Sequence, residues 1–267
     1  MRFSANLGFL WADRPLPDAI RAARAAGFDA VECHWPYDVP AGDVADALRD
    51  TGLPMLGLNT IRGDVAAGEN GLAALPGREA EARVAIDQAL DYARAVGAGA
   101  VHVMAGFAEG AKAAATFRAN LAYAAGAAAA DGITILIEPL NRYDAPGYFL
   151  STTDQARRVI ADVGAANLKL MFDCYHVQLM EGDLSHRVQA LLPLIGHVQF
   201  AGVPDRGPPD AGEVAYAHVF ALLDRLGWDR PLGAEYKPQG PTEETLGWLS
   251  ALREDATTRP GGTAANG

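Results

Sequence analysis

The chain has 267 residues, 50% of them hydrophobic and 21% charged, so it can bury the core of one large domain or two small ones. Its formal net charge of −11 argues against a nucleic-acid backbone or an anionic membrane as the main partner, because both would repel an acidic surface. Cys33 and Cys174 lie far apart and give no disulfide framework, and no apolar run is long enough to span a membrane. We therefore expect a soluble protein of the cytoplasm.

Strand-like and helix-like segments alternate along the whole chain. The apolar runs that predict strands are 2–7, 28–34, 54–59, 100–104, 133–138, 168–173, 195–201 and 231–236. The stretches that predict helices are 15–26, 43–51, 78–96, 112–130, 155–163, 183–192, 213–226 and 243–253.

Strict alternation predicts a parallel sheet covered by helices. Eight such units in a chain of this length predict a single-domain α/β fold, a (β/α)₈ TIM barrel over residues 1–256, followed by a disordered tail at 257–267. A doubly wound open sheet is the alternative. The chain has no GxGxxG after the first strand and no GxxxxGK[ST], so the sequence gives little support to a site for a dinucleotide or for nucleotide phosphates.

Four late strands each deliver one oxygen-bearing side chain near the strand end. These side chains are Glu138, Asp173, Gln199 and Glu235. In a parallel barrel the carboxyl ends of the strands meet on one face, so the four should converge. Three carboxylates and an amide oxygen suit Mg²⁺ or Mn²⁺, which could hold a 2-hydroxy carbonyl compound while two carboxylates act as base and acid. For each residue alone, a helix cap or a salt bridge remains the alternative.

Four histidines lie near the expected strand ends. His176, three residues beyond the strand-six carboxylate, could donate to a substrate oxygen or orient a ligand carboxylate. His102 alternates out of its strand and could reach the mouth of the barrel, whereas His197 shares a face with Gln199 and points to the barrel interior. His34 either lines the pocket or lies at the surface.

Three cations are candidates for binding an acidic substrate. Arg62 lies in the Gly-rich loop at 60–77, whose length predicts a lid that could bring it to a substrate carboxylate. Lys237 follows the last strand-end carboxylate, and Arg206 lies in the loop after the seventh strand. A solvated surface charge is the alternative for each of the three.

Several segments of the chain together resemble the hydroxypyruvate isomerase family, within the xylose-isomerase-like barrels. The resemblance extends from the first strand to about Lys237. The segments that carry it are Ile-Glu-Pro-Leu-Asn (137–141), Pro-Gly-Tyr-Phe-Leu (146–150), Phe-Asp-Cys-Tyr-His (172–176), His-Val-Gln-Phe-Ala-Gly-Val-Pro (197–204), Gly-Ala-Glu-Tyr (233–236) and Val-His-Val-Met-Ala-Gly (101–106).

The resemblance implies an isomerase of the aldose–ketose type. By this resemblance Glu138, Asp173, Gln199 and Glu235 are the metal ligands, and the two glutamates also transfer the proton. His176 matches a histidine that contacts substrate in related sugar epimerases, and His102, Arg62 and Lys237 complete the expected substrate contacts. Hydroxypyruvate would become tartronate semialdehyde (2-hydroxy-3-oxopropanoate) through an enediolate, a reaction of glyoxylate and carbohydrate metabolism. Glutamine at 199, where the epimerases carry histidine, favours this branch.

Alternatives remain open. Asn-Arg-Tyr-Asp at 141–144 resembles a loop of ketose 3-epimerases, so a 2-oxo-tetronate isomerase or a ketose 3-epimerase with the same site is the second hypothesis. The third hypothesis is phosphodiester hydrolysis, known from DNA-repair endonucleases of this barrel. It needs a His-rich zinc site and a basic groove, whereas this chain has six histidines and is acidic. The fourth hypothesis is a barrel that binds a ligand without converting it. The expected partner is a small hydroxy or oxo acid or a sugar, and a homo-oligomer stays open beside a monomer.

Overall fold

The structure is a computed structural model that describes residues 1–258, with side chains to residue 253. Strands and helices alternate as the sequence predicts. The strands are β1 (Phe3–Asn6), β2 (Ala30–Glu32), β3 (Leu58–Asn59), β4 (Ala100–His102), β5 (Thr134–Ile137), β6 (Leu168–Asp173), β7 (Ile195–Phe200) and β8 (Leu232–Ala234). The helices are α1 (Leu16–Ala25), α2 (Ala41–Thr51), α3 (Glu79–Val96), α4 (Gly110–Ala128), α5 (Thr153–Val163), α6 (Cys174–Met180), α7 (Leu184–Leu191), α8 (Tyr216–Arg225) and α9 (Gly247–Thr258).

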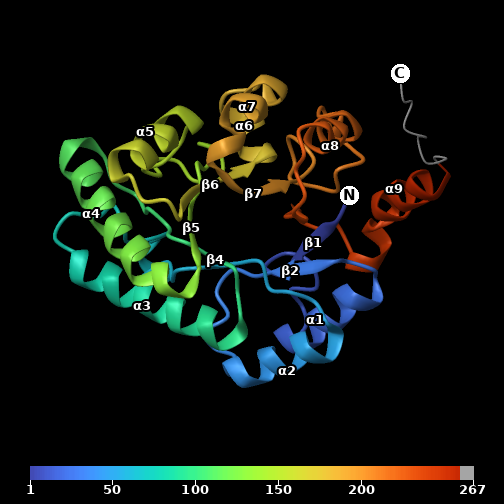
Figure 1. The fold of residues 1–267 in the computed structure, drawn as a ribbon, viewed down its shortest axis with the longest axis horizontal. Helices are drawn as coiled ribbons and strands as arrows, with labels where there is room; N and C mark the ends of the chain where they lie inside the picture. The colour runs from blue at the N-terminus through green and yellow to red at the C-terminus, as the bar shows by residue number, and fades with distance from the viewer. Residues whose placement is uncertain (259–267) are drawn as a thin grey trace, which may run out of the picture.

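The eight strands form one parallel sheet in the order β2-β1-β8-β7-β6-β5-β4-β3. A parallel bridge between Val31 of β2 and Met55 joins β2 to the segment that leads into β3, and the backbone N–H of Cys33 donates to the carbonyl oxygen of Gly57 at 3.1 Å. The sheet therefore closes on itself. Figure 1 shows the helices as a ring around the strands. The predicted (β/α)₈ TIM barrel is confirmed.

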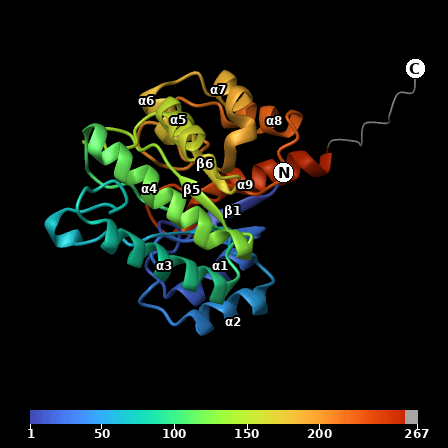
Figure 2. The same cartoon turned by 60° about the vertical axis from the view of Figure 1, so that its left-hand side comes forward.

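Apolar packing on the outside of the strands holds the helices in place. Phe117 and Leu121 of α4 have no exposed surface, and burying a side chain of this size stabilises the fold by ~1.5–3 kcal/mol. Phe3 of β1 packs edge-on against Phe200 of β7 and Trp248 of α9, with ring centroids 6.0 and 5.3 Å apart. The first strand and the last helix therefore lie side by side, as both views show (Figures 1 and 2).

Helix α6 is an element that the sequence analysis does not predict. It begins directly after Asp173, whose Oδ1 accepts a hydrogen bond from the backbone N–H of Tyr175 at 2.9 Å. Such a cap satisfies one of the free N–H groups at the start of a helix. The chain therefore turns into a helix at once, and His176 lies in its first turn beside Asp173.

The loop at 60–77 is in part a fixed element. Leu72, Ala73 and Ala74 are buried, and the N–H groups of Ala73 and Ala74 donate to the carbonyl oxygens of Met104 and Ala105 at 3.2 and 2.7 Å. For this part of the loop the predicted lid is wrong, because the backbone is hydrogen-bonded to the segment that follows β4. The length of the loop does not reveal this packing, whereas the apolar residues at 72–74 indicate it.

The last helix, α9, continues to Thr258. The rest of the predicted tail, residues 259–267, lies outside the described residues. Among the residues that the structure describes, no helix combines the length and the apolar composition needed to cross a membrane.

Candidate active site

The four strand-end side chains predicted as ligands converge at the carboxyl end of the barrel. Glu138 follows β5, Asp173 ends β6, Gln199 lies near the end of β7 and Glu235 follows β8. All four are nearly inaccessible, with 1–5% of their surface exposed. Their positions result from the parallel closed sheet, which brings all strand ends to one face.

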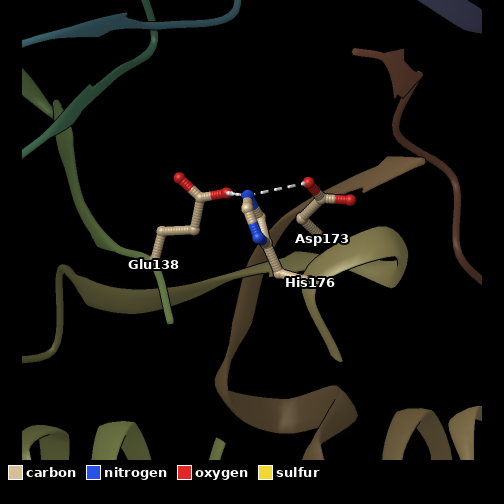
Figure 3. Close-up of side chains that lie close together, drawn as sticks. All are labelled: Glu138, Asp173 and His176. Carbon is tan, nitrogen blue, oxygen red and sulfur yellow. Dashed lines mark ion pairs between the residues drawn. The ribbon is translucent and has the colours of Figure 1, made fainter. Parts of the chain in front are cut away.

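Glu138, Asp173 and His176 form the tightest group. One ligand atom of each lies within 4.8 Å of the others, so this buried group could bind a metal ion. His176 Nε2 lies between the two carboxylates, 3.7 Å from Glu138 Oε1 and 3.6 Å from Asp173 Oδ2 (Figure 3). The helix α6 thus adds a nitrogen to a set that the sequence predicts as all-oxygen.

The hydrogen bonds of His176 decide which of its nitrogens carries the proton. Nδ1 lies 3.0 Å from the backbone nitrogen of Asn141, which can only donate, so Nδ1 must accept. Burial first, and the nearby Arg206 second, hold the pKa of His176 well below its ordinary value, so the ring is neutral. The proton is therefore on Nε2, and His176 presents an N–H donor to the site, which matches a substrate or carboxylate contact better than metal ligation.

Asn141 fixes this orientation through its own turn. Its Oδ1 accepts from the backbone N–H groups of Tyr143 and Asp144, both at 2.9 Å, so its Nδ2 must point the other way. Nδ2 lies 2.7 Å from His176 Nδ1 and 3.0 Å from Asp144 Oδ2. The loop at 141–144 therefore holds the histidine of α6.

Most of the buried polar side-chain atoms that lack a hydrogen-bond partner point into this site. Within the described residues eight such atoms occur, and six belong to it: Glu138 Oε1, Asp173 Oδ2, Gln199 Oε1, His176 Nε2 and both ring nitrogens of His102. Buried polar groups are normally hydrogen-bonded, so a cluster of unpaired ones needs partners that the chain does not supply. Three hard oxygens and several N–H donors fit a divalent cation with a bound oxygen-rich molecule.

Glu235 differs from the other three predicted ligands, because both of its oxygens are engaged. Oε1 accepts from Asn6 Nδ2 at 2.9 Å and lies 2.8 Å from His34 Nε2, while Oε2 accepts from Arg206 Nη2 at 2.7 Å. Burial acts to raise its pKa, but Arg206 and His34 more than offset it and lower the pKa below the ordinary value. Glu235 is held as a carboxylate.

Glu138 has the opposite electrostatic setting. Burial raises its pKa well above the ordinary value, and the carboxylates of Glu235 and Asp173 raise it further. His102, whose Nδ1 lies 3.6 Å from Glu138 Oε2, is kept neutral because burial lowers its pKa to about 3. In the metal-free protein the site therefore contains two carboxyl groups whose pKa is raised, Glu138 and Asp173, beside one whose pKa is lowered, Glu235, and acid–base catalysis uses carboxyl groups with such different pKa values.

Arg206 is the cation at the centre of the site. Its guanidinium lies 3.6 Å from Asp173 Oδ2 as well as on Glu235, and between the rings of Phe9 and Tyr175, 4.9 Å from each centroid. Its backbone has φ 55°, a conformation that side chains other than glycine rarely adopt. The sequence analysis names Arg206 only as one of three cations, because nothing local in its loop shows that the side chain is buried.

The other predicted substrate contacts lie differently. His176 and His102 are buried within the site. Arg62 is half-buried and stacks on the Trp35 ring, 4.2 Å from the centroid, and Trp35 in turn contacts the ring of His34. Lys237 is exposed, with Nζ 5.9 Å from the Phe9 ring centroid. Neither Arg62 nor Lys237 makes a hydrogen bond to the buried carboxylates.

Comparisons with known proteins show which family the chain belongs to. The sequence model of the xylose isomerase-like TIM barrel matches residues 20–252. A 2-oxo-tetronate isomerase of Cupriavidus necator is 48% identical over 93% of this chain and 97% of its own length, and the hydroxypyruvate isomerase of Escherichia coli is 39% identical over 95% and 100%. A crystal structure described as an AP endonuclease, family 2, from Brucella melitensis superposes with a TM-score of 0.91 at 40% identity, over 94% of this chain and 98% of that one. The chain therefore belongs to the family of xylose isomerase-like TIM barrels, in the group of relatives named for hydroxypyruvate and 2-oxo-tetronate isomerisation, as its sequence predicts.

Proposed function

We propose that the protein is a metal-assisted isomerase that interconverts hydroxypyruvate and tartronate semialdehyde. The observation that carries the proposal is the pair Glu138 and Glu235, two buried carboxyl groups at one oxygen-rich site, of which Glu138 has an oxygen without a partner and Glu235 is bound to Arg206. An isomerase that moves a proton between adjacent carbons needs one group to take it and one to give it. The name of the Escherichia coli relative is consistent with this reaction.

The cation would be Mg²⁺ or Mn²⁺, held by Glu138, Asp173, Gln199 and Glu235. Oxygen donors of this kind suit both ions and suit Zn²⁺ poorly. When bound, the ion supplies positive charge that stabilises the negative charge developing on two neighbouring substrate oxygens. Glu138, Asp173 and Gln199 each have an oxygen without a partner, whereas Glu235 must give up part of its contact with Arg206.

The different surroundings of Glu138 and Glu235 suggest which of them takes and which gives a proton. Glu235, as a carboxylate, takes a proton from C3 of hydroxypyruvate. Glu138, which binds the cation as a carboxylate, takes up a proton from solvent and gives it to C2. The proton of the C3 hydroxyl moves to the oxygen on C2, so the product is the isomer and no atom is gained or lost. The two carboxyl groups finish with their protons exchanged, and they reset through solvent before the next turnover.

The remaining polar groups would bind and orient the substrate. His176 Nε2–H faces the space between Glu138 and Asp173 and would donate to a substrate oxygen. Arg206, a partly buried cation in contact with Glu235, would bind the substrate carboxylate in a chain that otherwise carries an excess of negative charge. Arg62 and Lys237 stay predictions, tested by whether Arg62→Gln or Lys237→Gln raises KM.

A 2-oxo-tetronate is the second candidate substrate. The Cupriavidus necator relative, at 48% identity, bears that name, and the loop at 141–144 resembles that of ketose 3-epimerases. Such a substrate would use the same carboxyl pair. The endonuclease description of the Brucella melitensis structure has less support here, because the described residues place one oxygen-rich group at the strand ends and the chain carries a net charge of −11.

Deuterium incorporation tests the proposal. The protein is incubated in D₂O with hydroxypyruvate, then with EDTA, then with Mn²⁺ restored, and ¹H NMR follows the substrate and the product. The proposal predicts deuterium incorporation and product formation above the uncatalysed rate, lost with EDTA and regained with Mn²⁺. Activity only with a 2-oxo-tetronate or a ketohexose would assign the second candidate, and no exchange with any of these compounds would contradict an isomerase.

A further inference from the structure

A second layer of buried polar side chains contacts two of the predicted ligands, Gln199 and Glu235. It consists of Glu32 at the end of β2, Asn6 at the end of β1 and His197 on β7, which are 2–8% exposed. Glu32 is at its centre. Its Oε1 accepts from Gln199 Nε2 at 2.8 Å and from Asn6 Nδ2 at 3.1 Å, and its Oε2 lies 2.7 Å from His197 Nε2.

These contacts determine which end of the Gln199 amide faces the site. A carboxylate only accepts hydrogen bonds, so Gln199 must turn its NH₂ group toward Glu32. The amide oxygen then points the opposite way, and Gln199 Oε1 is one of the buried atoms without a partner among the described residues. An amide can be a metal ligand only through its oxygen, so this orientation decides whether Gln199 can bind a cation.

The same carboxylate is linked to Glu235. Asn6 Nδ2 lies between Glu32 Oε1 and Glu235 Oε1, at 3.1 and 2.9 Å. Asn6 Oδ1 accepts from the backbone N–H of Gly8 at 2.9 Å, which fixes the amide in this direction. Glu32 therefore contacts one predicted ligand directly and a second one through Asn6.

The barrel makes room for Glu32 at a glycine. A Cβ atom at Gly233 of β8 would lie 2.7 and 2.8 Å from the two carboxylate oxygens of Glu32 and 2.9 Å from Gln199 Cγ, closer than real Cβ contacts. Only glycine allows the carboxylate to lie across β8 in this position. The position of the Glu32 side chain therefore depends on Gly233, a residue of another strand that is distant in the sequence.

Below this layer the barrel is not filled by side chains. A cavity of about 360 Å³ extends from Glu32, His197 and Gln199 toward the opposite end of the barrel, where Ala100 and Gly196 line it. Close packing normally fixes side-chain rotamers in a barrel interior. Here the hydrogen bond to Glu32 is the contact that fixes the direction of the Gln199 amide, since packing from below is incomplete.

We propose that Glu32 is a positioning residue that presents Gln199 to the cation as an oxygen donor. The inference rests on the proposed metal site. A purely structural role for Glu32, as the partner of His197, is the competing explanation. The two explanations predict different results for a variant that keeps the shape of the Glu32 side chain but lets the Gln199 amide turn.

The test is Mn²⁺ binding to the metal-free full-length protein, measured by electron paramagnetic resonance and by calorimetry, with thermal unfolding followed in parallel. Glu32→Gln keeps the size of the side chain but can accept or donate, so Gln199 is free to turn its NH₂ group to the site. We expect Mn²⁺ affinity to fall about tenfold to a hundredfold, the usual effect of losing the residue that orients a ligand. Glu69→Gln removes the same charge from the loop at 60–77, far from Gln199, and should leave the affinity unchanged.

The exchanged pair Glu32→Gln with Gln199→Glu provides the rescue. It keeps the net charge, and a carboxylate at 199 presents oxygen whichever way it turns, with the new amide at 32 donating to it. Affinity within a few fold of the wild type supports positioning, whereas an exchanged pair as weak as Glu32→Gln overturns it. Wild-type affinity in Glu32→Gln also overturns the inference while leaving the metal site standing, and a wild-type protein that binds no Mn²⁺ contradicts both proposals. If Glu32→Gln does not fold, Glu32→Asp, which keeps the charge but withdraws it from Gln199, must show the same loss.

Discussion

Glu138 and Glu235 occupy equivalent places at the barrel mouth. Each follows directly after a buried strand, β5 or β8, and each is 5% exposed. Around Glu138 lie a neutral His102 and the unpaired Nε2 of His176, and no lysine or arginine among the described residues makes a hydrogen bond to it. Around Glu235 lie Asn6, His34 and the guanidinium of Arg206, all within hydrogen-bond distance.

The difference shows that the strand-end position alone does not determine the chemistry of a carboxyl group. Burial acts on both side chains in the same direction, toward the protonated form. On the side of β8 a buried cation outweighs burial, and on the side of β5 neighbouring carboxylates add to it. In the metal-free protein the same residue type on the same scaffold therefore favours the protonated form at Glu138 and the ionised form at Glu235.

Neutralising each carboxyl group should change stability in opposite directions. In the metal-free protein Glu235→Gln breaks a buried ion pair and should cost about 3 kcal/mol, the lower end of such effects because Arg206 keeps Asp173 and Asp144 nearby. Glu138→Gln removes a carboxyl group whose charged form is disfavoured and should leave stability unchanged or raised. Denaturant unfolding of the two variants measures this, and equal losses would contradict the contrast.

The pH dependence of stability sharpens the same contrast. A raised pKa means that the stabilising contribution of Glu138 is full below its ordinary pKa of 4.5 and is lost as the pH rises through the value in the folded protein. Metal-free Glu138→Gln should therefore lose less stability than the wild type when the pH is raised from about 5 to about 8. An identical pH dependence in the two proteins would contradict a raised pKa of Glu138 in the folded protein.

Weakening the contact between Arg206 and Glu235 should make the two carboxyl groups more alike. Arg206→Lys keeps the charge but loses the planar group that reaches Glu235 and Asp173, and kcat/KM should fall about tenfold to a hundredfold. Because Arg206 lowers the pKa of Glu235, the acidic limb of the kcat/KM profile should move to higher pH. Arg24→Lys, on the exposed face of α1, is the matched control for the same exchange of side chains. A fall in kcat/KM without a shifted limb would leave Arg206 a role in substrate binding alone.

The smallest expected effect concerns the turn that holds His176. Asn141→Ala removes the side-chain contact to Nδ1 at 2.7 Å but keeps the backbone N–H at 3.0 Å, so the proton should stay on Nε2 with a less fixed ring. The loss of one hydrogen bond of about 1 kcal/mol corresponds to an activity about fivefold lower. NMR of the ¹⁵N-labelled histidine ring shows the tautomer directly, and a proton found on Nδ1 would contradict the assignment.

Much of this arrangement follows from the order of residues along the chain. Glu138, Asp173, Gln199 and Glu235 each lie at or near the end of an apolar run. Each run predicts a strand, and the position of the residue predicts that its side chain lies at the carboxyl end of the barrel. The fold and the convergence of these four residues are therefore predictable, because closure of a parallel barrel brings all strand ends together.

The neighbours of these residues are less predictable. Arg206 lies in a proline-rich loop, and its backbone at φ 55° directs the side chain inward, which the loop sequence does not reveal. The helix α6 depends on a cap by Asp173 that forms only when the strand has ended there. Glu32 gives one local signal, a charge inside an apolar strand, but its importance depends on Gly233, which is distant in the sequence.

The most direct measurement separates the two proton transfers. Glu138→Gln and Glu235→Gln, each confirmed to bind Mn²⁺, are incubated with hydroxypyruvate in D₂O, and ¹H NMR follows the C3 protons and the product against protein-free solution. Glu138→Gln keeps the base, so it should exchange C3 protons for deuterium while forming product about 10²–10⁴-fold more slowly than the wild type. Glu235→Gln should do neither. Exchange at C3 that survives in Glu235→Gln and is lost in Glu138→Gln would contradict the assignment of the two carboxyl groups.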